Sequence, residues 1–252
     1  MAGDDRTMPL LGHLQELRGR LLKSLLAIAI AFVPTYLAAS ELFTFLSHPV
    51  LSATAEAPAL VGLGPTEAFF TKLKVAFIAA LFLASPALFY QLWQFVAPGL
   101  HQHEKRYVIP FIIFGPLFFF LGAGFCYRIV LPVAFAFFLE EYKTIGVQPT
   151  LRISEYLTFT ARMLLAFGVT FELPVFAFFF TRVGLITHQI LIQFFRYAVV
   201  LIFVLAAVLT PGPDVASQLL LAGPLLLLYA ISIGVAYVFG KRVESGELKV
   251  ES

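Results

Sequence analysis

The chain has 252 residues, of which 60% are hydrophobic and 13% are charged, whereas soluble domains contain about 45–50% and about 25%. A soluble core of this length cannot bury such an excess, so the composition excludes an ordinary soluble domain and indicates a membrane protein. The formal net charge of +2 gives no reason to expect a nucleic-acid partner, and the single cysteine, Cys126, excludes an intrachain disulfide.

Six long stretches of the chain are nearly free of charge. They predict transmembrane helices at approximately 21–40, 68–97, 107–128, 156–181, 191–209 and 215–238. Each meets or approaches the length of about 20 apolar residues that crosses a bilayer. We expect helices rather than a barrel, because lipid cannot satisfy open backbone groups and no stretch alternates with a period of two. The prediction is a single polytopic all-α membrane domain over residues 1–252.

Several prolines lie within or near the predicted spans, where each removes a helix hydrogen bond and can bend the helix. They are Pro86, Pro110, Pro116, Pro132, Pro174 and Pro224. We therefore expect bent helices that form a curved bundle. The third span also contains Gly115, Gly122 and Gly124, small residues that permit close approach of another helix.

Lysine and arginine are distributed unequally between the two sides of the predicted spans. Of the 17 basic residues, 11 lie before the first span, after the last, or around the second and fourth connections. The other six lie around the first and third connections, at about 41–67 and 128–155, where we expect short caps on the membrane surface. Because positive charge marks the cytoplasmic side, both termini are predicted to lie in the cytoplasm.

Glu172 is the one acidic residue in the middle of a predicted span, in the run FGVTFELPVF. A charged group at this depth costs about 2.5–3.5 kcal/mol or more, so it should face the bundle or water and find a partner. Thr210 and Gln218 are the candidate partners if the helical hairpin of the fifth and sixth spans packs against the fourth. The alternative is a protonated glutamic acid that serves packing alone.

Two further carboxylates flank spans on the predicted cytoplasmic side. Glu16 lies in HLQELRGR before the first span, and Glu104 lies in the loop PGLHQHEKRY. Paired carboxylates suit a ligand with paired arginines, because guanidinium binds carboxylate through two parallel hydrogen bonds. The alternative is local pairing of Glu16 with Arg20 at i,i+4, and of Glu104 with its basic neighbours.

Catalytic and cofactor motifs are absent from the sequence. It contains no G-x-S-x-G, no H-E-x-x-H and no phosphate loop, and His101 and His103 lack a third nearby metal ligand. We therefore expect no enzyme activity, no cofactor and no metal site.

Several long segments resemble the TatC family, the multispanning receptor subunit of the twin-arginine protein translocase. They are MPLLGHLQELRGRL, SPALFYQLWQFVAPGLHQHEKR, GFCYRIVLPVAF, FGVTFELPVF and LTPGPDVASQLLLAGPLLLLY. The resemblance covers nearly the whole chain. It implies six spans in a concave bundle, and a multimeric complex in the cytoplasmic (inner) membrane that exports folded proteins with the proton-motive force.

The resemblance also implies roles for individual residues. The positions that bind the twin-arginine signal peptide in this family match Glu16, Arg18, Phe95 and Glu104. The positions at which TatA/TatB-type single-span partners dock match Glu172, Thr210 and Gln218. Structural roles fall on Pro49, Pro86, Tyr127 and Asp214.

Two positions depart from the family pattern, and one other function stays open. Gly12 occupies a place that is often acidic, and Ala230 one that usually carries glutamate in the last span. The alternative function is a proton-coupled transporter of small solutes that uses Glu172, although no internal repeat supports it.

Overall fold

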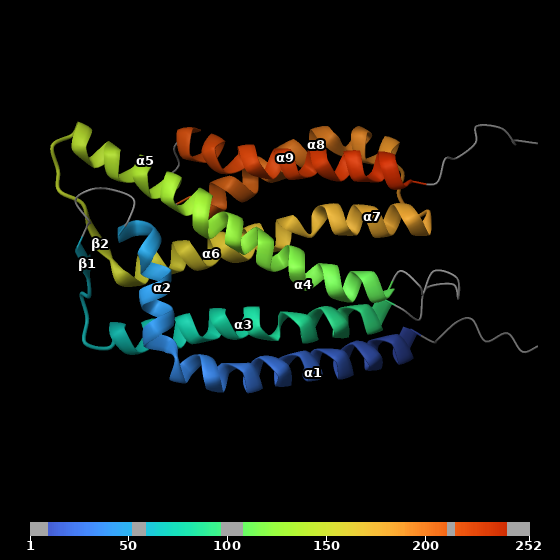
Figure 1. Ribbon diagram of the computed structural model, residues 1–252, viewed down its shortest axis with the longest axis horizontal. Coiled ribbons are helices and arrows are strands. Elements are labelled where there is room, and N and C mark those ends of the chain that lie inside the picture. Colours follow the sequence, from blue (N-terminus) through green and yellow to red (C-terminus); the bar gives the residue numbers. More distant parts are fainter. Residues whose placement is uncertain (1–9, 52–58, 97–107, 211–214, 241–252) are drawn as a thin grey trace, which may run out of the picture.

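The computed structural model describes residues 10–51, 59–96, 108–210 and 215–240 (Figure 1). In chain order its elements are helices α1 (Leu10–Leu37) and α2 (Ala39–Leu51), strand β1 (Ala59–Val61), helices α3 (Glu67–Val96) and α4 (Val108–Phe125), the π-helical turn η3 (Cys126–Val130), helix α5 (Leu131–Thr144), strand β2 (Thr150–Arg152), and helices α6 (Ile153–Phe171), α7 (Leu173–Val183), α8 (His188–Leu209) and α9 (Val215–Phe239).

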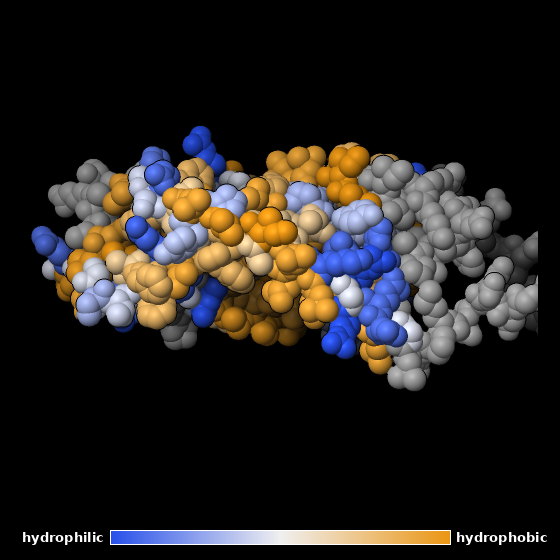
Figure 2. Space-filling model, turned by 90° about the horizontal axis from the view of Figure 1, so that it is seen from below, coloured by the Kyte–Doolittle hydropathy of each residue, from blue (hydrophilic) through white to orange (hydrophobic). Residues whose placement is uncertain are grey.

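Six segments of the described chain are long and apolar enough to cross a membrane, which confirms the predicted membrane class. They are Leu14–Leu37, Glu67–Val96, Phe111–Thr144, Ile153–Val183, His188–Leu209 and Val215–Phe239. Figure 1 shows these segments running alongside one another, with α2 crossing them near one end. Hydrophobic residues cover the middle of the surface in Figure 2, and hydrophilic residues gather towards its ends. Such a belt matches the hydrocarbon core of a bilayer.

The third span is longer than the predicted 107–128, because the helix does not end near Arg128. Helices α4 and α5 are joined through η3 into one apolar segment that reaches Thr144. Pro132 lies in the first turn of α5 and has no N–H for the carbonyl of Arg128, so the helix widens into a π-turn and continues. The Arg128 side chain is exposed, so its charge does not interrupt the helix.

The fourth span contains the expected proline bend. Helix α6 ends at Phe171, Glu172 forms the junction, and Pro174 lies in the first turn of α7. Because Pro174 has no N–H for the carbonyl of Thr170, the helix breaks and restarts. The break places Glu172 well inside the apolar segment Ile153–Val183.

The two connections predicted to lie outside are joined to each other at one end of the bundle. Strands β1 and β2 pair in parallel. The buried carboxyl group of Glu67 accepts hydrogen bonds from the backbone N–H of Leu63 at 2.7 Å and of Ser154 at 3.1 Å. Arg152 Nε donates to the same carboxyl group at 3.2 Å. These contacts fix the start of α3 beside the start of α6.

At the centre of the bundle, α4 and α6 approach each other closely. A Cβ atom on Gly122 of α4 would lie 2.5 Å from the carbonyl oxygen of Phe167, which is completely buried in the main core. A Cβ atom on Gly168 of α6 would lie 2.7 Å from the ring of Phe119. The two glycines therefore allow the helix backbones to touch, as small residues do between transmembrane helices.

The other two glycines of the third span differ from each other. A Cβ atom on Gly115 would lie 2.8 Å from the ring of Phe89 on α3, so close approach is confirmed there. A Cβ atom on Gly124 would meet no atom of another described helix within 4 Å, so the expectation of a close approach is wrong at that position.

The α4–α6 contact predicts that Gly122→Ala destabilises the protein. Alanine gains about 1 kcal/mol over glycine in a helix interior, but the added Cβ meets a backbone carbonyl that cannot rotate away, and overpacking costs about 1–3 kcal/mol. The expected net result is an unfolding temperature about 2–4 °C lower for each kcal/mol lost, measured by thermal unfolding of the detergent-purified protein.

The matched control is Gly124→Ala, which adds the same atom to the same helix in open space. Its unfolding temperature should stay unchanged or rise. Equal unfolding temperatures for the two variants would contradict the proposed importance of the α4–α6 contact.

Candidate functional site

Helices α1 and α3 pack against each other through small residues. Ala31 of α1 is buried in one cluster with Ala80 and Ala84 of α3. This packing brings the polar residues at the start of α1 next to those at the end of α3. Figure 1 shows that α9 ends at this same end of the bundle.

A guanidinium group is bound at this end of the bundle. Arg20 Nη2 donates to Oε1 of Glu16 at 3.0 Å, one helical turn away. Arg20 Nη1 donates to the side-chain oxygen of Gln94 and, at 3.5 Å, to that of Gln91, both on α3. Gln94 donates in turn to the hydroxyl of Tyr90. Acceptors from two helices therefore converge on one positive charge.

The carboxyl group of Glu16 keeps acceptor capacity. Its Oε2 is buried and makes no hydrogen bond among the described residues. The Arg20 contact involves one nitrogen and one oxygen, rather than the bidentate geometry of which the pair is capable. A carboxylate offers about four acceptor positions. The local Glu16–Arg20 pairing, expected as the alternative, is therefore present, and it leaves a position for a further donor.

The other residues expected to bind a signal peptide are only partly described. Arg18 is exposed on α1, and Phe95 is half-buried near the end of α3. Glu104 lies outside the described residues, so its proximity to Glu16 remains a prediction.

Glu172 is an enclosed carboxyl group inside the bundle. The residue is 3% exposed, and neither side-chain oxygen makes a hydrogen bond among the described residues. Gly168 precedes it by one helical turn and faces Phe119, and the backbone of Phe119 also lies beside the Glu172 carboxyl group. A polar group without its full set of partners is unfavourable in lipid, so the Glu172 carboxyl group has capacity for a further hydrogen-bond partner.

The expected hydrogen bonds from Thr210 and Gln218 to Glu172 are not formed. The Thr210 hydroxyl donates to the carbonyl of Ala207 at 3.3 Å, and Gln218 is half-buried in the first turn of α9. Helices α8 and α9 do pack against the fourth span, but mainly through α9 against α7. Helix α9 starts towards the β1–β2 end (Figure 1), so its first turn lies away from α7.

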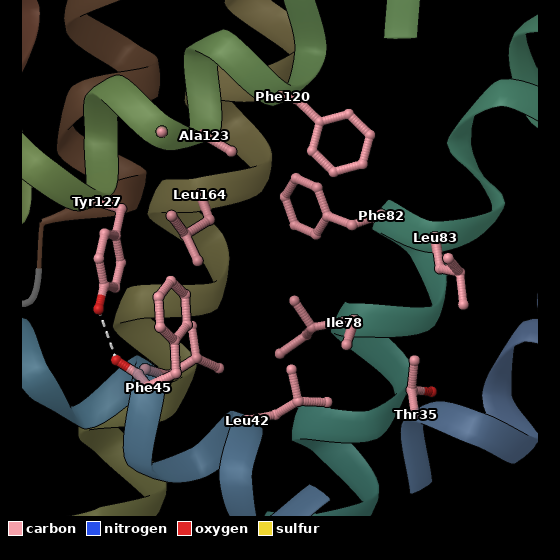
Figure 3. Close-up of a pocket in the computed structure, with 13 residues that line it drawn as sticks. Thr35, Leu42, Phe45, Ile78, Phe82, Leu83, Phe120, Ala123, Tyr127 and Leu164 are labelled. Carbon is pink, nitrogen blue, oxygen red and sulfur yellow. Dashed lines mark hydrogen bonds between the residues drawn. The ribbon is translucent and has the colours of Figure 1, made fainter. Parts of the chain in front are cut away.

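Tyr127 joins η3 to α2 (Figure 3). Its hydroxyl donates to the carbonyl of Phe45 at 2.7 Å, and the two rings stack with centroids 4.4 Å apart. Pro49 is buried in α2, and Pro86 lies in the interior of α3. Structural roles for these three residues stay predictions, and Asp214 lies outside the described residues.

An apolar pocket of about 470 Å³ lies beside Tyr127 (Figure 3). Two residues of its lining carry hydroxyl groups, and both hydroxyls bind backbone carbonyls, that of Tyr127 as described and that of Thr35 to Ala76 at 2.9 Å. The other lining residues are apolar. The described lining of this pocket therefore offers no free polar group with which to bind a small polar solute.

The predicted set of site residues omits the acceptors on α3. Gln91 and Gln94 are three residues apart in YQLWQF, which places both on one face at the end of an apolar helix. That spacing is the signal that could have identified them. Gly168 was likewise omitted, although it lies one turn before Glu172.

Comparison with known proteins gives one consistent family. Residues 12–224 match the profile of the Sec-independent protein translocase protein (TatC) family. A TatC protein of Desulforapulum autotrophicum is 43% identical over 98% of this chain and 91% of its own length. One of Campylobacter jejuni is also 43% identical, over 88% of this chain and 90% of its own.

The fold agrees with solved structures of the same family. A crystal structure of the twin arginine translocase receptor TatC is 38% identical, with a TM-score of 0.82, over 90% of this chain and 99% of that one. A second, in the detergent DDM, is 39% identical with a TM-score of 0.81, over 89% and 99%. The chain therefore belongs to the TatC family of Sec-independent protein translocase proteins.

Proposed function

We propose that this chain binds the twin-arginine signal peptides of folded precursor proteins, as the receptor subunit of the translocase. The observation that carries this proposal is the guanidinium group bound between α1 and α3 by Glu16, Gln91 and Gln94. A cluster of acceptors that already holds Arg20 has the chemistry that recognises an arginine side chain.

The incoming arginines would use the acceptor capacity that Arg20 leaves unused. Oε2 of Glu16 has no hydrogen bond among the described residues, and Glu104 would supply a carboxylate for the second arginine. Phe95 and Arg18 would contact the peptide beside them. Because these contacts are electrostatic and partly exposed, binding should weaken as salt concentration rises. The apolar stretch of the signal peptide would then insert along the concave bundle.

We assign both termini to the cytoplasm and the chain to the cytoplasmic (inner) membrane. Helix α1 begins and α9 ends at the same end of the bundle (Figure 1). The sequence places 11 of its 17 basic residues on that side of the spans, and positive charge marks the cytoplasmic side. The guanidinium site then faces the compartment in which precursor proteins fold.

Glu172, with Thr210 and Gln218, is proposed to recruit TatA/TatB-type single-span subunits into a multimeric complex. The support is the carboxyl group of Glu172, which has no hydrogen-bond donor among the described residues. Since Glu172 is 3% exposed, docking would require its surroundings to open. The break between α6 and α7 supplies a hinge for this movement. Transport would use the proton-motive force through these partners.

The alternative function, a proton-coupled transporter of small solutes, gains no support from the family or from the solved structures. The TatC family is a component of protein transport. The apolar pocket beside Tyr127 also lacks free polar groups for a solute.

The receptor proposal predicts that Glu16→Ala combined with Glu104→Ala abolishes crosslinking to a twin-arginine signal peptide. Glu16→Ala alone should weaken binding about tenfold or more, because a hydrogen bond to a charged group contributes about 1.5–3 kcal/mol. Site-specific photo-crosslinking in membranes, with a peptide titration of the purified protein, measures both effects.

Gln15→Ala is the control for these variants, because Gln15 is exposed and adjacent to Glu16 on α1. It should bind the signal peptide as the unmodified chain does. The double variant must still insert into the membrane, and retained crosslinking in an inserted double variant would overturn the receptor assignment.

The docking proposal predicts different outcomes for two substitutions of Glu172. Glu172→Gln keeps an oxygen that can accept a hydrogen bond, so single-span subunits should still co-purify. Glu172→Leu has a similar size and no acceptor, so co-purification should be lost while the protein stays folded. Undiminished co-purification with Glu172→Leu would show that partners dock elsewhere.

A further inference from the structure

Two of the basic residues counted with the first and third connections lie a short way inside α3 and α6, near the β1–β2 end and away from the guanidinium site. Lys74 is on α3, seven residues after Glu67, and Arg162 is on α6, nine residues after Ile153. At about 1.5 Å per residue, these positions are roughly 10 Å and 13 Å inside the starts of the two segments. Charge at such a depth requires an anionic partner or access to water.

Contacts between α3 and α6 place the two cations together. Lys74 Nζ donates to the hydroxyl oxygen of Thr158 at 2.7 Å, and that hydroxyl donates to the carbonyl of Ser154 at 2.5 Å. Arg162 follows Thr158 by four residues, so it projects from the same face of α6. The Lys74 ammonium and the Arg162 guanidinium therefore occupy neighbouring positions on one surface.

These two positive charges lack an ion-pair partner among the described residues. The salt bridges found among the described residues involve other cations, namely Arg20, Lys143 and Arg152. Glu67 is occupied by Arg152 and by two backbone N–H groups. Among the described residues, the surface around Lys74 and Arg162 thus carries positive charge without a compensating acid, and it complements an anion.

The surroundings of the cations indicate a lipid as the source of that anion. Arg162 is exposed, and so are the apolar side chains that continue from it towards the middle of the bilayer, Phe77 on α3 (49%) and Val169 on α6 (63%). The hydrocarbon core is about 30 Å thick within a total of about 40–45 Å. Long basic side chains near this boundary extend towards the headgroup layer.

We propose that Lys74 and Arg162 bind the headgroup phosphate of a phospholipid in the leaflet at the β1–β2 end. The acyl chains of the bound lipid lie over Phe77 and Val169. Arg162 contributes planar, multiple N–H donors and Lys74 a point charge held by Thr158, a combination suited to a phosphate. Both charges favour an anionic headgroup over a zwitterionic one.

Native mass spectrometry of the full-length protein tests this site, with phosphatidylglycerol and phosphatidylcholine as the added lipids. Lys74→Gln retains a hydrogen-bond donor for Thr158 and removes the charge, and Arg162→Gln removes the second charge. Each substitution should lower retention of phosphatidylglycerol about fivefold, and their combination should remove the preference over phosphatidylcholine. Arg162→Lys should restore most of it.

Lys72→Gln is the matched control. Lys72 is an exposed cation of the same helix, two residues before Lys74, so it points to a different side. This variant should retain phosphatidylglycerol as the unmodified chain does.

Equal retention by the Lys72→Gln protein and the folded double variant would overturn the proposal, as would displacement of the lipid by inorganic phosphate at low concentration. Signal-peptide binding, measured on the same samples, should stay unchanged. If the unmodified protein does not bind the signal peptide, that result would count against the receptor function and not against the lipid site.

Discussion

The hydrocarbon core of the membrane cannot compensate polar groups, so each carboxylate within or beside the spans depends on donors from the protein. Three carboxylates meet this requirement to different degrees. Glu67 receives three donors and joins the two connections at the strand end. Glu16 receives one from Arg20 and keeps one oxygen unpaired, and Glu172 receives none among the described residues. We infer that Glu67, whose carboxyl group has several hydrogen-bond donors, serves the fold. Glu16 and Glu172, whose carboxyl groups keep free acceptor positions among the described residues, serve binding.

Two prolines interrupt the regular α-helical hydrogen bonding of the spans, one beside Glu172 and one at the π-turn η3. Pro174 breaks the fourth span just after Glu172, and Gly168, one turn before Glu172, faces Phe119 of α4. Pro132 widens the third span into η3 and so presents Tyr127 to the carbonyl of Phe45. Both effects follow from one missing N–H within an otherwise regular helix. The two adjacent helices, α4 and α6, can still touch because Gly122 replaces a side chain at their crossing.

The class of the fold and the positions of single unusual residues could be predicted from the sequence, because they depend on local composition. Six apolar stretches and a lone Glu172 are visible without any knowledge of neighbours. Contacts between helices could not be predicted in the same way. The acceptors Gln91 and Gln94 bind Arg20 across a helix interface, and the expected partner Thr210 instead donates to its own helix. Both outcomes depend on rotation and register of packed helices, which periodicity does not determine.

The two ends of the bundle are held together by different kinds of interaction, and this difference indicates where movement can occur. At the strand end, paired backbone and the saturated Glu67 connect α3 to α6. At the opposite end, α1 is joined to α3 by hydrogen bonds from Arg20 to Gln91 and Gln94. The end of α3 is itself fixed to α4 and α7 by the buried cluster of Trp93, Phe111 and Phe179. Side-chain contacts near the surface exchange with less cost than contacts around a buried carboxyl group such as that of Glu67. A ligand that competes for Glu16 therefore acts on the more adaptable contact, between α1 and α3, while the strand end preserves the spacing of the spans.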